Sequence, residues 1–143
     1  MKGNSGFIVV IPARFGSKRL PGKPLKKILG LPMVIRTCIQ CLKVVKRSQL
    51  IVATDDIRIQ KCCEKYSINS MLTSKKCKTG TDRVAEVAKK IKVKNYINVQ
   101  GDEPIFNPSD LKKMINHIKK NKNKILLGYT KIENKINIRN KNI

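Results

Sequence analysis

The sequence has no tryptophan, and aromatic residues make up only 4% of its 143 residues. A buried core must therefore consist mainly of isoleucine, valine and leucine. No apolar run approaches the roughly 18 residues that a membrane-spanning helix needs. The amino terminus also lacks the apolar segment of a secretion signal. These absences favour one globular domain over 1–143, located in the cytoplasm and with no membrane partner.

Residues that commonly carry metal or nucleophilic chemistry are also few. His117 is the single histidine, and it accompanies no suitably spaced serine or cysteine, which argues against a hydrolytic triad. The five cysteines are an odd number, which argues against a disulfide framework and for a reducing compartment. Cys38 and Cys41 have metal-like spacing, but no second pair or histidine stands near them. We therefore expect them to be structural.

Acidic residues are scarce: the chain has nine Asp and Glu but 32 Lys and Arg, and no acidic residue precedes Asp55. The resulting net charge of +23 is compatible with a non-catalytic basic nucleic-acid-binding protein, which remains the alternative function. However, 25 of the 32 cations are lysines, and few aromatic residues are interleaved with them. This pattern favours a broad compositional bias over a dedicated nucleic-acid surface.

Short apolar runs alternate with amphipathic stretches along the chain. Strands are predicted at 6–12, 49–53, 69–73, 96–100 and 124–133. Helices are predicted at 31–46, 56–66, 81–91 and 107–120. This alternation predicts right-handed βαβ connections and a three-layer α/β/α fold around a mostly parallel sheet. Ligands of such sheets bind beyond the carboxyl ends of the strands.

The segment 11–25, with the sequence IPARFGSKRLPGKPL, follows the first predicted strand directly. It contains four cations within ten residues: Arg14, Lys18, Arg19 and Lys23. Cations, free backbone N–H groups and glycines together suit a polyphosphate. The loop is not a nucleotide-binding P-loop, because five residues separate Gly16 from Gly22, where a P-loop has four, and Pro24 follows the lysine. A solvated basic turn is the structural alternative.

A second motif, YINVQGDEP at 96–104, contains another predicted apolar strand, 96–100, and continues beyond its end. Asp102 is well placed there to hold Mg²⁺ on nucleotide phosphates, although an Asp that stabilises a turn is equally compatible. Gln100 suits a base or a sugar hydroxyl, or is plain polar surface. In a third loop, Thr81 is a candidate helix N-cap. Arg83 in the first turn opposes the helix dipole, which points to an anion or a base nearby.

Four motifs occur in this order: IPARFGSKRLPGKPL, IVATDD, KTGTDRVAEV and NVQGDEP. With them, residues 6–143 closely resemble the N-terminal part of the 3-deoxy-manno-octulosonate cytidylyltransferases, also called CMP-KDO synthetases. The resemblance implies a fold like that of nucleotide-diphosphosugar transferases. It also implies an enzyme that uses Mg²⁺ and transfers CMP from CTP to the anomeric hydroxyl of KDO. Pyrophosphate is released, and the product supplies lipopolysaccharide synthesis.

The resemblance also implies roles for individual residues. At the triphosphate it places Arg14, Ser17, Arg19 and Lys23. Elsewhere it places Ala13 at the cytosine, Arg83 near the nucleotide, Gln100 at the sugar acid and Asp102 at the metal. Of these, Arg14, Lys23 and Asp102 are the expected catalytic residues.

Members of this family are longer than the present chain, so the resemblance implies a truncated protein. The absent half is expected to carry a second metal-binding carboxylate, much of the KDO pocket and the homodimer surface. We therefore expect this polypeptide alone to bind CTP weakly and to turn over poorly or not at all.

Overall fold

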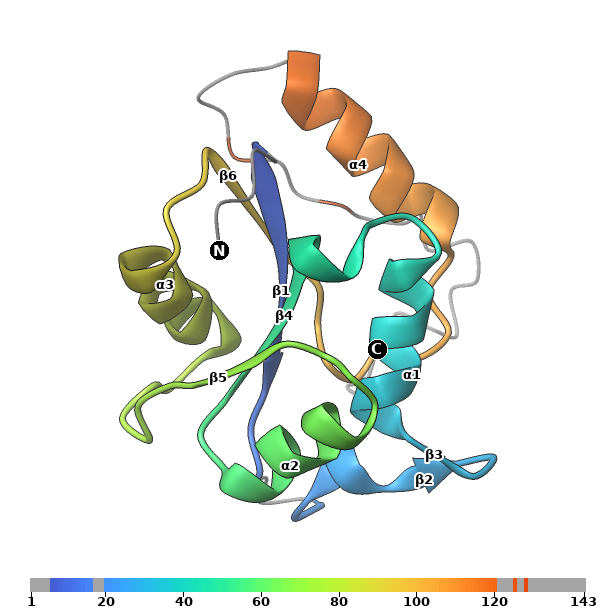
Figure 1. Cartoon of the computed structure of the whole chain (residues 1–143), viewed down its shortest axis with the longest axis vertical. Coiled ribbons are helices and arrows are strands. Elements are labelled where there is room, and N and C mark those ends of the chain that lie inside the picture. The colour runs from blue at the N-terminus through green and yellow to red at the C-terminus, as the bar shows by residue number, and fades with distance from the viewer. Residues whose placement is uncertain (1–5, 17–19, 121–124, 126–127, 129–143) are drawn as a thin grey trace, which may run out of the picture.

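The computed structural model describes residues 6–16, 20–120, 125 and 128 (Figure 1). The strands are β1 (Phe7–Ala13), β2 (Lys27–Ile28), β3 (Leu31–Pro32), β4 (Leu50–Thr54), β5 (Ser70–Leu72) and β6 (Asn95–Asn98). The α-helices are α1 (Met33–Leu42), α2 (Ile57–Lys65), α3 (Gly80–Lys90) and α4 (Pro108–Lys120). Two short 3₁₀ helices, η1 (Lys23–Leu25) and η2 (Arg47–Gln49), precede β2 and β4.

Four strands form one sheet in the order β5-β4-β1-β6, and all of its pairings are parallel. In the centre, β1 pairs with β4, where Val9 lies opposite Leu50, and with β6, where Phe7 lies opposite Asn95. The predicted α/β fold with a parallel sheet is therefore confirmed. Because the strands are parallel, their carboxyl ends all lie at the same end of the sheet, and this end is here called the carboxyl edge.

Helices cover both faces of the sheet, because side chains of β1 alternate between two cores. Val9 and Ile11 pack into the larger core, together with buried residues of α1, α2 and α4. Ile8 and Val10 pack into the smaller core, together with Val87 of α3. Figure 1 shows the same division, with α3 on one side of the sheet and the other three α-helices opposite. This is the predicted three-layer arrangement.

The sequence predicts a helix over 31–46, but α1 is shorter because Leu31 and Pro32 pair with β2 in a hairpin. The connecting turn is Leu29-Gly30, in which both residues have positive φ, 47° and 82°. Such two-residue turns usually carry Asn-Gly, so a leucine at the first position hides the signal. The guanidinium of Arg36 donates to the carbonyls of Ile28 and Leu29 and stabilises the turn.

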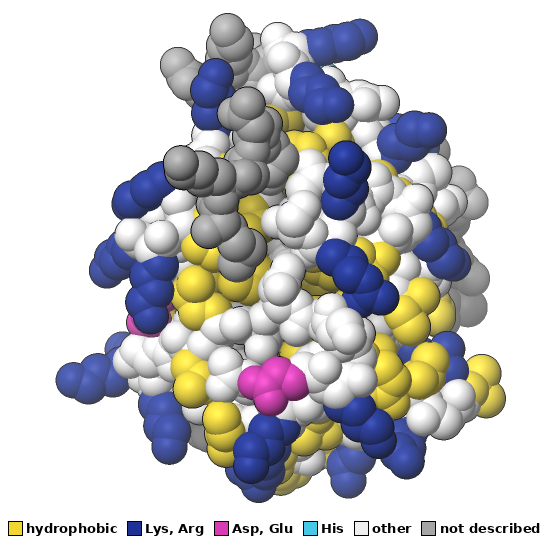
Figure 2. Space-filling view, in the orientation of Figure 1, with side chains coloured by type: hydrophobic (Ala, Val, Ile, Leu, Met, Phe, Trp, Pro, Cys, Tyr) yellow, Lys and Arg dark blue, Asp and Glu magenta, His cyan; other side chains and the backbone are white. Residues whose placement is uncertain are grey.

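The excess of positive charge is spread over the molecule. On the face in Figure 2, Lys and Arg side chains surround the whole outline and only a few acidic side chains appear. The Lys and Arg side chains do not gather in a single stripe on that face, which agrees with a general excess of lysine in the composition. None of the helices within the described ranges has the length and apolarity that crossing a membrane requires. The strand predicted at 124–133 falls almost wholly outside the described residues, and 125 and 128 have no regular structure.

Candidate functional site

The basic loop leaves the carboxyl edge of the sheet directly after β1. Ala13, the last residue of that strand, is buried, and Arg14 is exposed. The loop returns at Gly22, which has a left-handed φ of 67° and precedes Lys23, the first residue of η1. Glycine adopts this conformation without strain, so the turn delivers Lys23 back to the end of β1. Ser17 and Arg19 lie outside the described residues.

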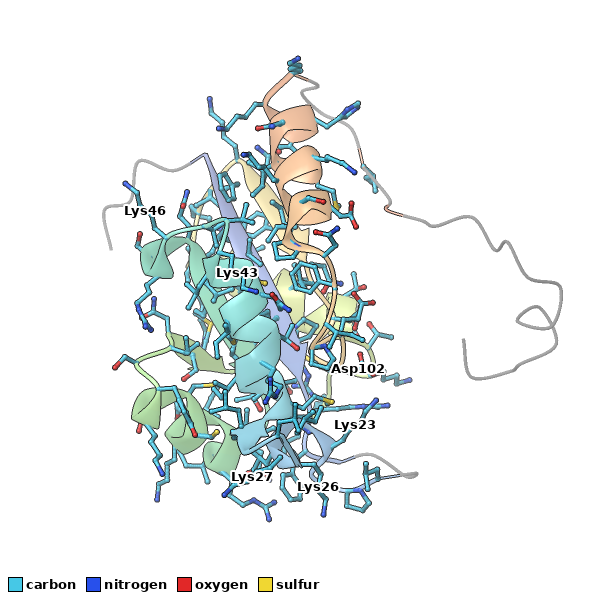
Figure 3. All side chains as sticks on the ribbon, turned by 90° about the vertical axis from the view of Figure 1, so that its right-hand side faces the viewer. Lys23, Lys26, Lys27, Lys43, Lys46 and Asp102 are labelled. Atoms are coloured by element: carbon cyan, nitrogen blue, oxygen red, sulfur yellow. The ribbon has the colours of Figure 1, made fainter. Side chains whose placement is uncertain are left out.

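Lys23 and Asp102 meet at this edge, although 79 positions separate them in the sequence. The Lys23 ammonium donates to Asp102 Oδ2 over 2.7 Å. Figure 3 shows the two residues side by side, whereas Lys43 and Lys46 lie toward the opposite end of the molecule. The prediction that the two motif loops converge is therefore confirmed. Their side chains are 38% and 51% exposed, so both remain accessible to a ligand.

The turn that carries Asp102 is fixed by its backbone. A side-chain Cβ on Gly101 would lie 2.7 Å from the carbonyl oxygen of Pro12, so only glycine allows this approach. The buried hydroxyl of Thr37 on α1 also donates to the Gly101 carbonyl over 3.2 Å. Asp102 is therefore held at a defined distance from the end of β1 by contacts with two other elements.

A cavity of about 240 Å³ lies between the two loops. It brings together every predicted site residue that the structure describes: Ala13, Arg14, Lys23, Arg83, Gln100 and Asp102. Its walls also include Lys78, Met33 and Gly80, whose participation the sequence did not reveal. A Cβ on Gly80 would lie 3.0 Å from the Pro12 side chain, so glycine lets the start of α3 approach the strand end.

Arg83 is 2% exposed and is bonded to groups of the chain itself. It donates to Asp55 Oδ2 over 2.8 Å, to the Thr73 hydroxyl over 2.7 Å and to the Ser74 carbonyl over 3.2 Å. The sequence pointed to a ligand as the anion beside this arginine. In the structure, the anion is the carboxylate of Asp55. Arg83 still contributes to the cavity wall, but its side chain is held in place.

The N-cap of α3 also differs from the prediction, since Thr79 and not Thr81 occupies that position. The Thr79 hydroxyl accepts the backbone N–H of Asp82, and the Asp82 carboxylate accepts the backbone N–H groups of Thr79 and Lys78. The hydrogen bonds to the Asp82 carboxylate hold its pKa below the usual value, and the bond from the backbone N–H of Thr79 has the largest effect. This reciprocal arrangement fixes the loop that forms one side of the cavity.

No cysteine or histidine is among the described residues that line this cavity. Cys38 is fully buried in the larger core, as predicted, and Cys41 is buried beside it. Burial raises the pKa of the Cys41 thiol to about 12, which opposes the thiolate form that binds metals. His117 is exposed on α4, which agrees with its predicted surface position.

A sequence profile of the family described as "Cytidylyltransferase" matches residues 8–142. An Escherichia coli protein named 3-deoxy-manno-octulosonate cytidylyltransferase is 40% identical over 111 residues, which are 78% of this chain and 45% of that protein. A protein of the same name from Polynucleobacter necessarius is 48% identical over 115 residues, which are 78% of this chain and 43% of that protein. The chain thus spans less than half the length of these curated relatives.

Solved structures agree with the sequence comparison. One is described as CMP:2-keto-3-deoxy-manno-octonic acid synthetase complexed with CTP, and it matches with a TM-score of 0.78 and 39% identity. The match covers 81% of this chain and 48% of that one. A cytidylyltransferase from Leptospira borgpetersenii has the same fold, with a TM-score of 0.73 at 20% identity over 82% of this chain and 50% of that one. By fold and by sequence, the present chain belongs to the cytidylyltransferase family.

Proposed function

We propose that this chain binds CTP with Mg²⁺ in the cavity at the carboxyl edge of the sheet and transfers CMP to the anomeric hydroxyl of KDO. The observation that carries this proposal is the contact between Lys23 and Asp102, which brings a cation suited to phosphate and a carboxylate suited to a metal into one cavity. The names of the similar proteins identify the nucleotide and the sugar acid as candidates.

In the proposed reaction, the anomeric oxygen of KDO forms a bond to the α-phosphorus of CTP. The bond from that phosphorus to the oxygen that bridges to the β-phosphate breaks, and pyrophosphate leaves with the bonding electrons. The proton of the anomeric hydroxyl passes to solvent. Such transfers need positioning and charge neutralisation more than a protein nucleophile. Arg14 and Lys23 supply positive charge at the triphosphate, and Ser17 and Arg19 belong to the same proposal. No histidine is required.

The donor set at the cavity fits a magnesium ion that is shared with the substrate. Mg²⁺ is usually held by one or two carboxylates together with substrate phosphates and waters. Asp102 offers a half-exposed carboxylate, whereas the described part of the chain has no cluster of three His, Cys, Asp or Glu for a metal. A bound Mg²⁺ would neutralise phosphate charge beside Asp102. Lys23 would then exchange its present partner, Asp102, for a phosphate oxygen.

The remaining wall residues suit recognition of the two substrates. Ala13 ends β1 and lines the cavity, and we assign its backbone to the cytosine. Gln100 is exposed at the cavity and offers both a donor and an acceptor to the sugar acid. Because the contacts described above engage both terminal nitrogens of Arg83, we assign it to shaping the cavity near the nucleotide.

The comparisons give no support to a non-catalytic nucleic-acid-binding protein. The family match covers nearly the whole chain, and the proteins reported above are named for cytidylyl transfer. KDO as the acceptor belongs to the proposal, whereas a homodimer is implied only for the longer members of the family.

Pyrophosphate release tests the proposed reaction. The purified chain is incubated with Mg²⁺, KDO and either CTP or ATP, and pyrophosphate is measured over time. We expect at most slow release, which depends on KDO and on CTP and disappears when a chelator removes Mg²⁺. Release that is equal with ATP, or independent of KDO, would contradict the proposal.

A further inference from the structure

Phe15 lies between the two cavity cations in the sequence, yet it is not part of the cavity wall. Its backbone is fixed on both sides. The Phe15 N–H donates to Asp55 Oδ1 over 3.2 Å, and the Phe15 carbonyl accepts the N–H of Gly22 over 2.9 Å. The second bond, between Phe15 and Gly22, joins the two ends of the basic loop, and this junction is here called the neck of the loop. Arg14 and Lys23 are the residues immediately outside that neck, so the position of Phe15 determines where both cations emerge.

The ring of Phe15 is fixed as well. The guanidinium carbon of Arg58 lies 3.4 Å from the ring centroid, which is a cation–π contact. On another side the ring packs so closely on Gly22 that a Cβ there would lie 3.1 Å from it. Arg58 is in turn held by Asp56, to which it donates over 2.7 and 2.8 Å. The start of α2 thus holds the neck of the basic loop.

Asp55 extends this arrangement to the opposite wall of the cavity. One carboxylate oxygen accepts the Phe15 N–H, and the other accepts from Arg83, whose side chain forms part of the wall. Like Phe15, neither Asp55 nor Arg58 lines the cavity. The three residues that do not line the cavity therefore hold Arg14, Lys23 and Arg83, which do.

We propose that Phe15, Asp55 and Arg58, here called the Phe15 clamp, are positioning residues that preorganise the cations of the cavity for a triphosphate. The proposal rests on the proposed function, because CTP is the ligand whose phosphates these cations meet. Long cationic side chains lose conformational freedom on binding, and a fixed neck reduces that loss before the ligand arrives. The clamp therefore strengthens CTP binding without a contact to CTP.

A double-mutant cycle on CTP affinity tests the clamp. Calorimetry with CTP and Mg²⁺ is carried out on the wild-type chain, Arg58→Met, Phe15→Leu and the double variant. We expect each single variant to bind CTP roughly two- to fivefold more weakly, the range of a cation–π contact at an exposed site. If Arg58 acts through the Phe15 ring, the double variant should bind CTP no more weakly than the single variant with the lower CTP affinity. Arg58→Lys, which keeps the charge, should recover part of the affinity.

Arg47→Met is the matched control. Arg47 is also exposed, and it donates to the carbonyls of Tyr66 and Ser67 near the amino ends of the strands. Its replacement removes the same charge and should leave CTP affinity unchanged. Thermal melts of all variants separate loss of positioning from loss of folding. Arg58→Met replaces an exposed side chain, so it keeps the test open if Phe15→Leu does not fold.

Three results from the variants would overturn the clamp alone. Unchanged CTP affinity in Arg58→Met would show that the stacked guanidinium positions nothing. Strictly additive losses in the double variant would show that Arg58 acts by charge and not through Phe15. Equal losses in Arg47→Met and Arg58→Met would show a dependence on total charge alone. If the wild-type chain itself gives no saturable CTP signal, the proposed function fails and the clamp fails with it.

Discussion

The two ends of the parallel sheet carry cavities of similar size and very different chemistry. The cavity at the carboxyl edge, of about 240 Å³, is lined by four cations and one carboxylate: Arg14, Lys23, Lys78, Arg83 and Asp102. The cavity at the amino edge is larger, at about 300 Å³, but its walls are formed mainly by apolar and amide side chains. Lys119 is the single charged residue among those that line it.

The difference shows that volume alone does not mark a functional site. At the carboxyl edge, chain segments leave the strands as loops, and loops can carry charged groups that a buried strand cannot. At the amino edge, the cavity wall includes a contact between neutral groups, in which the Asn95 amide donates to the Gly6 carbonyl over 3.1 Å. Each prediction below compares a change at the carboxyl edge with a matched change elsewhere.

The largest effect on stability is expected for the ion pair between Asp55 and Arg83, beside the cavity at the carboxyl edge. Asp55→Ala leaves Arg83 buried without its anion, which should lower the free energy of unfolding by roughly 3 kcal/mol. This is the lower end of the range for buried pairs, because the Asp55 side chain is 16% exposed. Asn95→Ala at the amino edge should cost about 1 kcal/mol. Urea unfolding measures both, and equal losses would remove the distinction between the two edges.

The next effect concerns the lysines of the two cavities. Lys23→Ala removes a charge-assisted contact of roughly 1.5–3 kcal/mol, so CTP affinity with Mg²⁺ should fall about ten- to a hundredfold. Lys119→Ala removes the same charge from the amino-edge cavity and should leave CTP affinity unchanged. Calorimetric titration measures both variants. If Lys23→Ala binds CTP as tightly as the wild type, the phosphate-binding role assigned to Lys23 is wrong.

Asp102→Asn should change how CTP binding depends on metal. With the carboxylate gone, the ratio of CTP affinities with and without Mg²⁺ should approach one. Without Mg²⁺, CTP should bind slightly better than to the wild type, because Lys23 is released from its ion pair. Asp110→Asn is the control, since Asp110 forms an exposed ion pair with Lys113 on α4. An unchanged Mg²⁺ dependence in Asp102→Asn would place the metal elsewhere.

The smallest effect is a pH dependence of stability at the base of the Phe15 clamp. The hydrogen bond from Arg58 lowers the pKa of Asp56 to about 2 in the folded chain. The unfolded value is about 4. Stability from this pair is therefore complete above about pH 4 and is lost as the pH falls toward 2. Asp56→Asn should show a slightly lower urea midpoint at pH 7 and a flatter decline between pH 4 and 2. A decline as steep as that of the wild type would exclude Asp56 as its source.

The sequence was sufficient to predict the sheet and the convergence of the two motifs. Apolar runs mark the strands, and the parallel arrangement alone places the loops after β1 and β6 at one edge. The partner of Arg83 was missed because Asp55 lies 28 positions away, and local spacing carries no information on such pairs. Phe15 looked like an ordinary apolar residue in a basic loop. Its role depends on Arg58, which only tertiary packing brings over the ring.

Lys23 and Asp102 together form the proposed binding site for a metal-chelated CTP. The decisive experiment is calorimetric titration of the wild-type chain with CTP, in the presence and absence of Mg²⁺. We expect saturable binding at one site that Mg²⁺ strengthens and that ATP does not reproduce. No saturable heat with CTP and Mg²⁺, or equal heats with ATP, would contradict it.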